Sequence, residues 1–155
     1  MPLDANAPLD ASLPRDTTVP RWLRQGLRSV ALDLKARRAR GHVSPVLWAG
    51  VPGEEARAAA FDTGVVPRRQ TLDRSDHLEV ALALAHVVRP LVRAPIFWVT
   101  RSGTPDLCDP DLSWLAATRG ACDVLDLEHQ FAVVTREGWH HEPSGTVHRW
   151  KRLRA

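Results

Sequence analysis

The chain has few of the residues that build disulfide frameworks or membrane spans. Among its 155 residues there are two cysteines, Cys108 and Cys122, and they form no Cys-x-x-Cys pair. We therefore expect two reduced thiols and no structural disulfide. No stretch approaches the roughly 20 consecutive apolar residues of a membrane helix, and the segment starting at Met1 lacks the basic-then-apolar order of a secretory signal. The expectation is a cytoplasmic protein without a membrane partner.

Motifs that define common enzyme classes are missing as well. The chain contains neither Gly-x-x-x-x-Gly-Lys nor Gly-x-Gly-x-x-Gly, which disfavours the usual nucleotide-dependent enzymes. It also has no Gly-x-Ser-x-Gly, the turn that presents a nucleophilic serine. Seven histidines occur, but their spacing matches no structural zinc site. The sequence thus predicts no metal and no cofactor.

Lysine, isoleucine and tyrosine are scarce, whereas nineteen of the 21 basic residues are arginine. The base composition of a genome explains such an overall bias, so local clusters of charge are more informative. Residues 21–42 hold seven basic side chains and one aspartate, and residues 102–135 hold six acids and one arginine. This asymmetry indicates contact with another molecule, or docking of the two surfaces on each other within one chain or between two copies.

The beginning of the chain differs in composition from the rest. Prolines stand at positions 2, 8, 14 and 20, and this density blocks both helices and central strands. Residues 1–19 are therefore predicted to form a disordered tail rich in proline and aspartate. Residues 20–155 are predicted to form one domain, because their number suffices for one compact core and not comfortably for two.

A basic amphipathic helix is predicted from Pro20 to near Gly41. Its apolar residues recur at helical spacing, while Arg24, Arg28 and Arg38 lie along another face. The segment 76–89 is the most apolar helix, with Asp76 and Glu79 as its capping pair. Two shorter helices are predicted over 52–61 and from Asp109 or Pro110 to Arg119.

Short apolar runs bounded by glycine or proline predict strands over 45–50, 95–100, 131–136 and 146–153, with a further strand or turn at 64–67. The last two strands are predicted to be antiparallel, because the chain between them is too short for a helical crossover. His140 and His141 would lie in their hairpin loop. The predicted fold class is α/β (or α+β): one domain with a mixed sheet flanked by helices and a basic N-terminal helix.

Two apolar runs end in the same Val-Thr-Arg-x-Gly signature, at 99–103 and 134–138. Strand ends in α/β domains are where side chains meet ligands. We therefore expect Arg101 and Arg136 at one edge of the sheet with an anion between them. The candidate anion-binding residues are Arg101, Arg136, Arg24, Arg28 and Arg38.

Residues 98–138 carry a spacing of polar residues that points to a known family. Ser102 and Gly103 follow a predicted strand, and Asp111 opens a helix eleven residues after Thr100. This resembles the core of JAB/MPN domains, including the bacterial RadC-type proteins, in which a strand ends in His-x-His-Pro and an aspartate follows eleven residues after the second histidine. The next strand of the family resembles residues 124–134 here.

The departures from the family pattern concern its metal ligands. The two histidine positions fall on Trp98 and Thr100, and the family's serine falls on Cys108. A zinc hydrolase needs at least three protein ligands, and Asp111 alone remains of the set. The resemblance therefore implies a scaffold that has lost its metal-binding histidines rather than a peptidase.

The leading functional hypothesis is a non-enzymatic binding or scaffold domain. It would recognise an anionic partner, either nucleic acid or an acidic protein surface, through the basic helix. A second copy of the chain is a further candidate partner. The alternative is a metal-independent enzyme, or a small-anion-binding protein, with a cleft near Arg101, Asp111 and Arg136. Its candidate catalytic residues are Ser102, Cys108 and Asp111. Four tryptophans are either pocket lining or core: Trp98, Trp114, Trp139 and Trp150.

Overall fold

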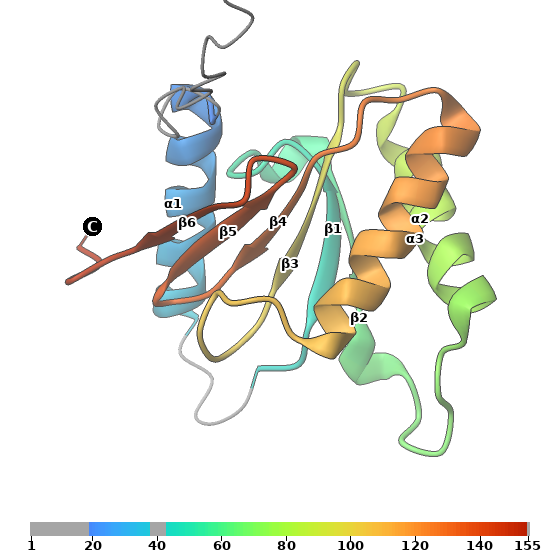
Figure 1. The fold of residues 1–155 in the computed structure, drawn as a ribbon, viewed down its shortest axis with the longest axis horizontal. Coiled ribbons are helices and arrows are strands. Elements are labelled where there is room, and N and C mark those ends of the chain that lie inside the picture. Colours follow the sequence, from blue (N-terminus) through green and yellow to red (C-terminus); the bar gives the residue numbers. More distant parts are fainter. Residues whose placement is uncertain (1–18, 38–42, 155) are drawn as a thin grey trace, which may run out of the picture.

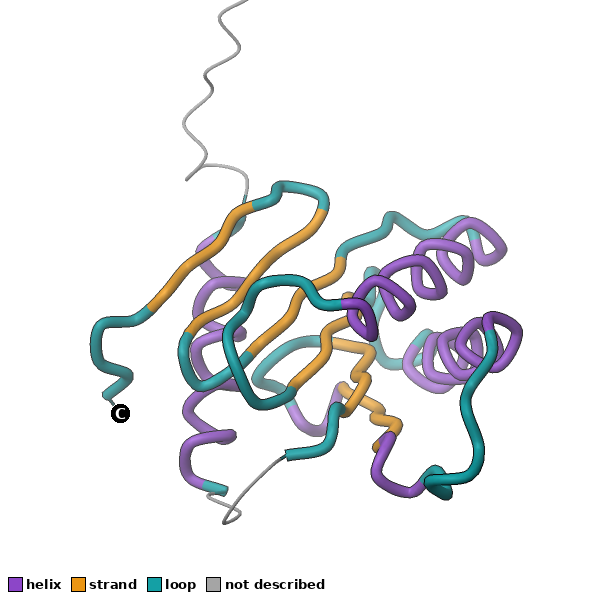
Figure 2. The backbone as a smooth tube through the Cα atoms, turned by 60° about the horizontal axis from the view of Figure 1, so that its bottom comes forward, coloured by secondary structure: helices purple, strands orange, loops and turns teal. Residues whose placement is uncertain are grey.

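The fold has three layers, with one mixed sheet between helices on both faces. The structure is a computed structural model that describes residues 19–37 and 43–154. Helix α1 (Arg21–Ala36) covers one face of the sheet, and α2 (Arg74–Val88) and α3 (Asp109–Leu125) cover the other (Figures 1 and 2). This confirms the predicted α/β domain with a mixed sheet flanked by helices. The predicted tail lies almost entirely in residues 1–18, outside the described residues.

Six strands form the sheet in the order β2-β1-β3-β4-β5-β6. Their bounds are β1 Val46–Gly50, β2 Ala58–Asp62, β3 Ile96–Thr100, β4 Phe131–Val134, β5 Gly138–Glu142 and β6 Thr146–Arg149. Strands β3 and β4 are parallel, and the other neighbouring pairs are antiparallel. The carboxyl ends of β3 and β4 therefore lie at the same edge of the sheet.

Strand β3 is the centre of the molecule because both of its faces are covered. All five of its residues are buried. Phe97 and Val99 pack against α2 and α3, whereas Ile96 and Trp98 belong to the cluster under α1. A continuous apolar run of this kind is what a strand buried on both faces requires.

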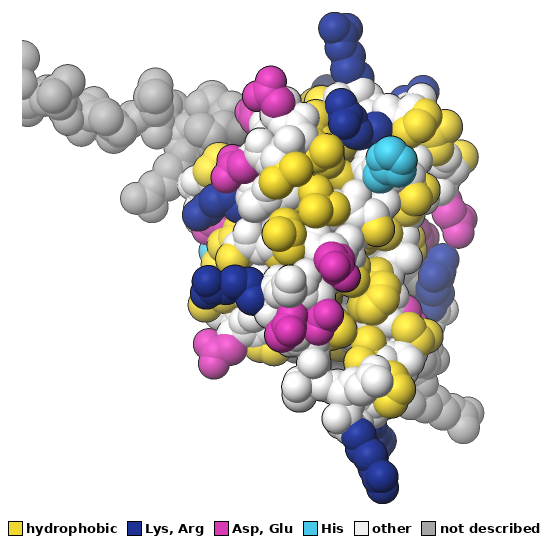
Figure 3. Space-filling view, turned by 90° about the vertical axis from the view of Figure 1, so that its right-hand side faces the viewer, with side chains coloured by type: hydrophobic (Ala, Val, Ile, Leu, Met, Phe, Trp, Pro, Cys, Tyr) yellow, Lys and Arg dark blue, Asp and Glu magenta, His cyan; other side chains and the backbone are white. Residues whose placement is uncertain are grey.

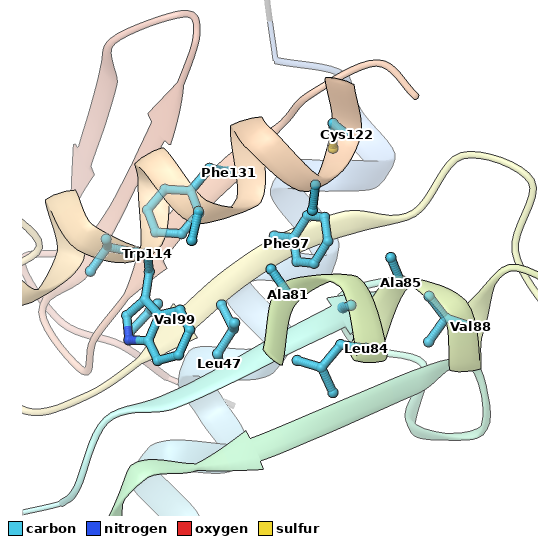
Figure 4. Close-up of a cluster of buried hydrophobic side chains, with 14 residues drawn as sticks. Leu47, Ala81, Leu84, Ala85, Val88, Phe97, Val99, Trp114, Cys122 and Phe131 are labelled. Carbon is cyan, nitrogen blue, oxygen red and sulfur yellow. The ribbon is translucent and has the colours of Figure 1, made fainter. Parts of the chain in front are cut away.

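The larger core lies between the sheet and the pair α2 and α3. Figure 4 shows Trp114 of α3, Ala81 and Leu84 of α2, and Phe97 of β3 converging in it. The predicted helix 76–89 is α2, although its capping box is formed by Asp73 and Asp76 rather than by Asp76 and Glu79. The backbone N–H of each of these two aspartates donates a hydrogen bond to the carboxylate of the other. This satisfies two backbone donors at the start of the helix.

The smaller core lies under α1. Leu23, Leu27 and Ala31 are fully buried against Ile96 and Trp98 of β3 and against residues of β4 and β5. Gly26 allows the helix to approach the loop after β1, since a Cβ atom there would lie 2.4 Å from the carbonyl oxygen of Pro52. Arg38 and the predicted end of the helix near Gly41 lie outside the described residues.

Between β1 and α2, the structure contradicts one prediction and decides between the two alternatives of another. The predicted helix over 52–61 was wrong: a single 3₁₀ turn (Glu55–Arg57) leads into β2. Alanines favour a helix locally, but here they pair with β1, with Ala59 opposite Ala49. The segment 64–67, expected as a strand or turn, begins within a short 3₁₀ turn (Thr63–Val65) and contains no strand.

Four predictions near the end of the chain also need correction. The strand expected over 124–134 is only β4, from Phe131 to Val134, because α3 continues to Leu125 and ends at Asp126 in the left-handed conformation. The expected hairpin loop with His140 and His141 is strand β5, which pairs antiparallel with both β4 and β6, so these two strands run in the same direction and are not antiparallel neighbours as predicted. The last strand ends at Arg149 rather than at residue 153. None of the described helices is long and apolar enough to cross a membrane.

Candidate functional site

The predicted strand-end site contains a buried ion pair. Arg101 follows β3 directly, and its Nε and Nη2 atoms donate to Asp111 at 3.0 and 2.7 Å. Its Nη1 atom donates to the carbonyl oxygens of Ser102 and Thr104, and Nη2 also donates to that of Asp106. All five N–H donors of a guanidinium are thus used. Arg101 fixes the loop before α3 and has no donor left for an external anion.

Asp111 completes this arrangement from the first turn of α3. Its side chain is 1% exposed, and it accepts hydrogen bonds from the backbone N–H of Cys108 at 3.0 Å and from its Sγ at 3.2 Å. The hydrogen bond with Asp111 also raises the pKa of Arg101 above its usual value. The start of a helix favours a carboxylate through its unpaired N–H groups. The geometry therefore assigns Asp111 a structural contact with Arg101 and Cys108.

The other strand-end candidates are placed differently. Ser102 Oγ accepts a hydrogen bond from the backbone N–H of Val43 at 3.0 Å. Arg136 follows β4 at the same edge, but its guanidinium bonds to no described residue, and its Nη2 atom is buried. The structure thus brings Arg101, Cys108 and Asp111 into contact, and it shows no bond between Arg136 and any of them.

The positions at which the resembled family has histidines lie in the layer under α1. Trp98 stacks on Trp48, with ring centroids 5.9 Å apart, and Thr100 accepts a hydrogen bond from Trp48 Nε1 at 3.0 Å. Both line a cavity of about 270 Å³ between α1 and the sheet. An indole and a hydroxyl engaged in this way do not supply zinc ligands. Among the described residues, no group of three or more His, Cys, Asp or Glu side chains could hold a metal ion.

Two histidines, the half-buried His129 before β4 and the buried His141 in β5, have structural partners. His129 Nε2 lies 2.8 Å from Thr118 Oγ1, while His141 is hydrogen-bonded to Gln130 and Ser144. Burial lowers the pKa of His129 to about 4 and also lowers that of His141. Both imidazoles are therefore neutral near pH 7 and hold the surrounding turns together.

We expect these histidines to make the fold sensitive to acid. An unfolded chain takes up protons near pH 6.5, whereas folded His129 takes one up only near pH 4, so stability falls as the pH drops between these values. His129→Gln should flatten this dependence in part, because His141 contributes in the same direction. The measurement is the melting temperature by circular dichroism between pH 4 and pH 7. His86→Gln, at an exposed position on α2, serves as the control, and an equal effect of both variants would contradict the assignment.

A second cavity, of about 320 Å³, opens between α1 and the last two strands. We call it the basic cleft, and it is lined by Arg21, Arg24, Gln25, Arg28, Trp139, His148 and Trp150. No carboxylate is among these residues. In Figure 1, α1 lies across the part of the sheet that β5 and β6 form.

The aromatic wall of the basic cleft is built by strand pairing. Trp139 of β5 stands opposite His148 of β6, and their rings stack with centroids 5.6 Å apart. Trp150 meets His148 edge-on at 5.4 Å. Trp139 is only 3% exposed, whereas His148 is exposed and Trp150 is half-buried. Trp139 is therefore held within the protein, whereas the ring of His148 is accessible to solvent.

The opposite wall is a stripe of arginines on α1. Arg21, Arg24 and Arg28 recur at spacings of three and four residues, which places them on one face of the helix. Arg21 and Arg24 form no ion pair and no side-chain hydrogen bond with a described residue, and Arg28 donates to the carbonyl oxygen of Arg154. The guanidinium groups of this wall thus have no described carboxylate partner.

The segment after β6 adds further positive charge beside α1. Leu153 is buried in the smaller core, and its carbonyl oxygen accepts a hydrogen bond from Lys35 Nζ at 2.6 Å. This contact holds the exposed Lys151, Arg152 and Arg154 near the helix. The α2 and α3 face differs, since apolar and acidic side chains occupy its centre and basic ones project near its margins (Figure 3).

The basic cleft contains residues that were predicted from the sequence and residues that were missed. Arg24 and Arg28 were candidates for anion binding, and Trp139 and Trp150 were considered as pocket lining. His148 and the basic residues after it were not identified, although rings and cations alternate in the sequence from His148 to Arg152. The chain matches no protein-family model, no curated protein and no solved structure.

Proposed function

We propose that this protein binds nucleic acid through the basic cleft and that its role is binding rather than catalysis. The observation that carries the proposal is the combination of three arginines and an aromatic wall in one open cavity that no carboxylate of the described residues lines. Arginine suits phosphate because its planar guanidinium can donate two parallel hydrogen bonds. Aromatic rings add a surface on which bases stack.

The arrangement of charge favours an extended anion. From Arg21 to Arg28 the helix rises about 10 Å, the length of about three stacked nucleotides along one strand. Lys151 and Arg152 lengthen this positive surface beyond the cleft. Guanidinium groups and ammonium groups in such a row would contact successive phosphates, and the release of their counterions would drive binding.

An acidic protein surface is the less favoured partner. Contact with carboxylates needs the arginines but gives no role to the exposed ring of His148. The internal alternative, in which α1 docks on the acidic segment 102–135, receives no support from charge pairing. Among the described residues, no ion pair joins α1 to that segment, and α1 packs on the sheet through apolar side chains.

The test is a fluorescence anisotropy titration with a labelled strand of 20 nucleotides and with the matching duplex, from 50 to 300 mM salt. We expect the affinity for at least one of them to fall steeply with salt, by about 0.7–0.9 powers of the salt concentration per phosphate contact. The double variant Arg21→Glu/Arg24→Glu should weaken binding at 50 mM salt at least about tenfold and lower the salt slope by about two.

Arg68→Glu/Arg69→Glu is the matched control, because it makes the same change of net charge at two exposed arginines outside the basic cleft. It should leave the affinity within about twofold of the unaltered protein. Absence of binding to both oligonucleotides at 50 mM salt would refute the proposed function. Equal losses in the two double variants would show that binding depends on net charge and not on the basic cleft.

A further inference from the structure

We infer that the basic cleft accepts single-stranded nucleic acid and stacks an unpaired base on His148 beside Trp150. This inference rests on the proposed function and narrows it to one class of ligand. Its basis is the presence of an accessible aromatic face inside the cavity that also holds the arginines.

The ring geometry explains the preference for an unpaired base. In a duplex the bases stack on one another, so their flat faces are covered, and proteins read the edges and the phosphates instead. A protein ring can stack only on a base that has left the duplex or never entered it. Trp139 stacks on His148 and Trp150 meets it edge-to-face, yet His148 remains exposed to solvent. The exposed ring is thus available for stacking.

The aromatic wall is formed before any ligand arrives. The pairing of β5 with β6 sets Trp139 against His148, and the backbone N–H of Trp150 donates to the carbonyl oxygen of Glu137 at 3.0 Å. The buried side chain of Leu153 then anchors the following segment. A base that stacks here would order few protein groups, which reduces the entropic cost of binding.

The dimensions agree with a single nucleotide unit beside a short stretch of backbone. The cavity of about 320 Å³ is at the lower end of the volumes that small ligands occupy. The arginine stripe on α1 lies across the cavity from the rings, so a base on His148 would leave its phosphates on the side of α1. The rings on one wall would thus contact a base of a nucleic-acid strand, and the guanidinium groups on the other wall would contact the phosphates of the same strand.

The experiment compares three labelled DNA probes, each ten nucleotides long. They are a single strand, the same sequence in a duplex, and an abasic phosphodeoxyribose strand. We expect the single strand to bind more tightly than the duplex. His148→Ala should weaken single-strand binding about 5- to 150-fold and leave binding of the abasic strand unchanged. Trp150→Phe keeps a ring and should retain most of the affinity. His86→Ala, at an exposed histidine of α2, should have no effect.

The other outcomes separate this inference from the function on which it rests. If the duplex binds as tightly as the single strand and His148→Ala behaves like His86→Ala, stacking is refuted, while salt-dependent binding through Arg21 and Arg24 still supports the proposed function. If His148→Ala weakens the abasic strand as much as the normal one, the ring acts on the backbone and the inference is also overturned. Because His148 is exposed, its replacement should leave the melting temperature within a few degrees, and this is checked by circular dichroism.

Discussion

Asp111→Ala should lower the free energy of unfolding by about 3–5 kcal/mol, the cost of leaving one partner of a buried ion pair without its counterpart. The Arg101 side chain is 10% exposed and that of Asp111 is 1% exposed, so water can replace little of the lost contact. The variant also removes the hydrogen-bond acceptor for the backbone N–H of Cys108 at the start of α3. Urea unfolding followed by tryptophan fluorescence measures the change.

Asp109 provides the matched control for this prediction. It lies in the same first turn of α3 but is exposed, so Asp109→Ala should cost only about 0.3–1 kcal/mol through the helix dipole. A second variant, Arg101→Met, leaves Asp111 unpaired instead and should be comparably destabilising. If Asp111→Ala and Asp109→Ala differ by less than about 1 kcal/mol, the carboxylate of Asp111 does not have the role assigned to it.

Gly50→Ala should be the second strongly destabilising change. Gly50 ends β1 with φ +133°, and a Cβ atom there would lie 1.9 Å from the carbonyl oxygen of Arg57. The backbone conformation costs a non-glycine residue about 1–3 kcal/mol. Displacing the backbone of Arg57 costs about 1–3 kcal/mol more, because that carbonyl accepts the hydrogen bond of Val51 at the turn into β2. The shift of the urea midpoint measures the loss.

Gly145→Ala separates the two contributions to this cost. Gly145 has φ +69°, and no atom of the described residues lies within 4 Å of a Cβ atom there. This variant therefore retains the cost of a left-handed backbone and lacks the collision. It should be clearly less destabilising than Gly50→Ala, and equal losses would mean that the contact with Arg57 is relieved without cost.

The sequence predicts best those elements whose own residues determine them. Strand β3 is a continuous apolar run, and α2 has many apolar residues. Both elements could be predicted because such residues must be buried. Strand β2 shows the opposite case: its three alanines favour a helix locally, and only the neighbouring β1 holds them in extended form. Strand β5 likewise has no clear alternation in Gly138–Glu142, and its conformation depends on pairing with both β4 and β6.

The candidate site was predictable only in part, for a related reason. The arginines of α1 form a stripe that can be read from their spacing, but the rings that face them come more than 100 residues later in the sequence. Trp139 and His148 meet because β5 and β6 pair in one register. The repeated Val-Thr-Arg-x-Gly signature, by contrast, could be read from the sequence but did not locate the candidate site. It correctly marked two strand ends, yet Arg101 is fully engaged inside the protein.

The hydrogen bond from Arg28 to Arg154 joins residues that are 126 positions apart, and this separation bears on how the protein is made. On the ribosome, α1 emerges long before β5, β6 and the segment around Leu153, so its apolar residues Leu23 and Leu27 lack their final partners during most of synthesis. The basic cleft cannot form until β5, β6 and the segment around Leu153 are available to α1. The binding that we propose for it therefore requires residues from both ends of the described fold.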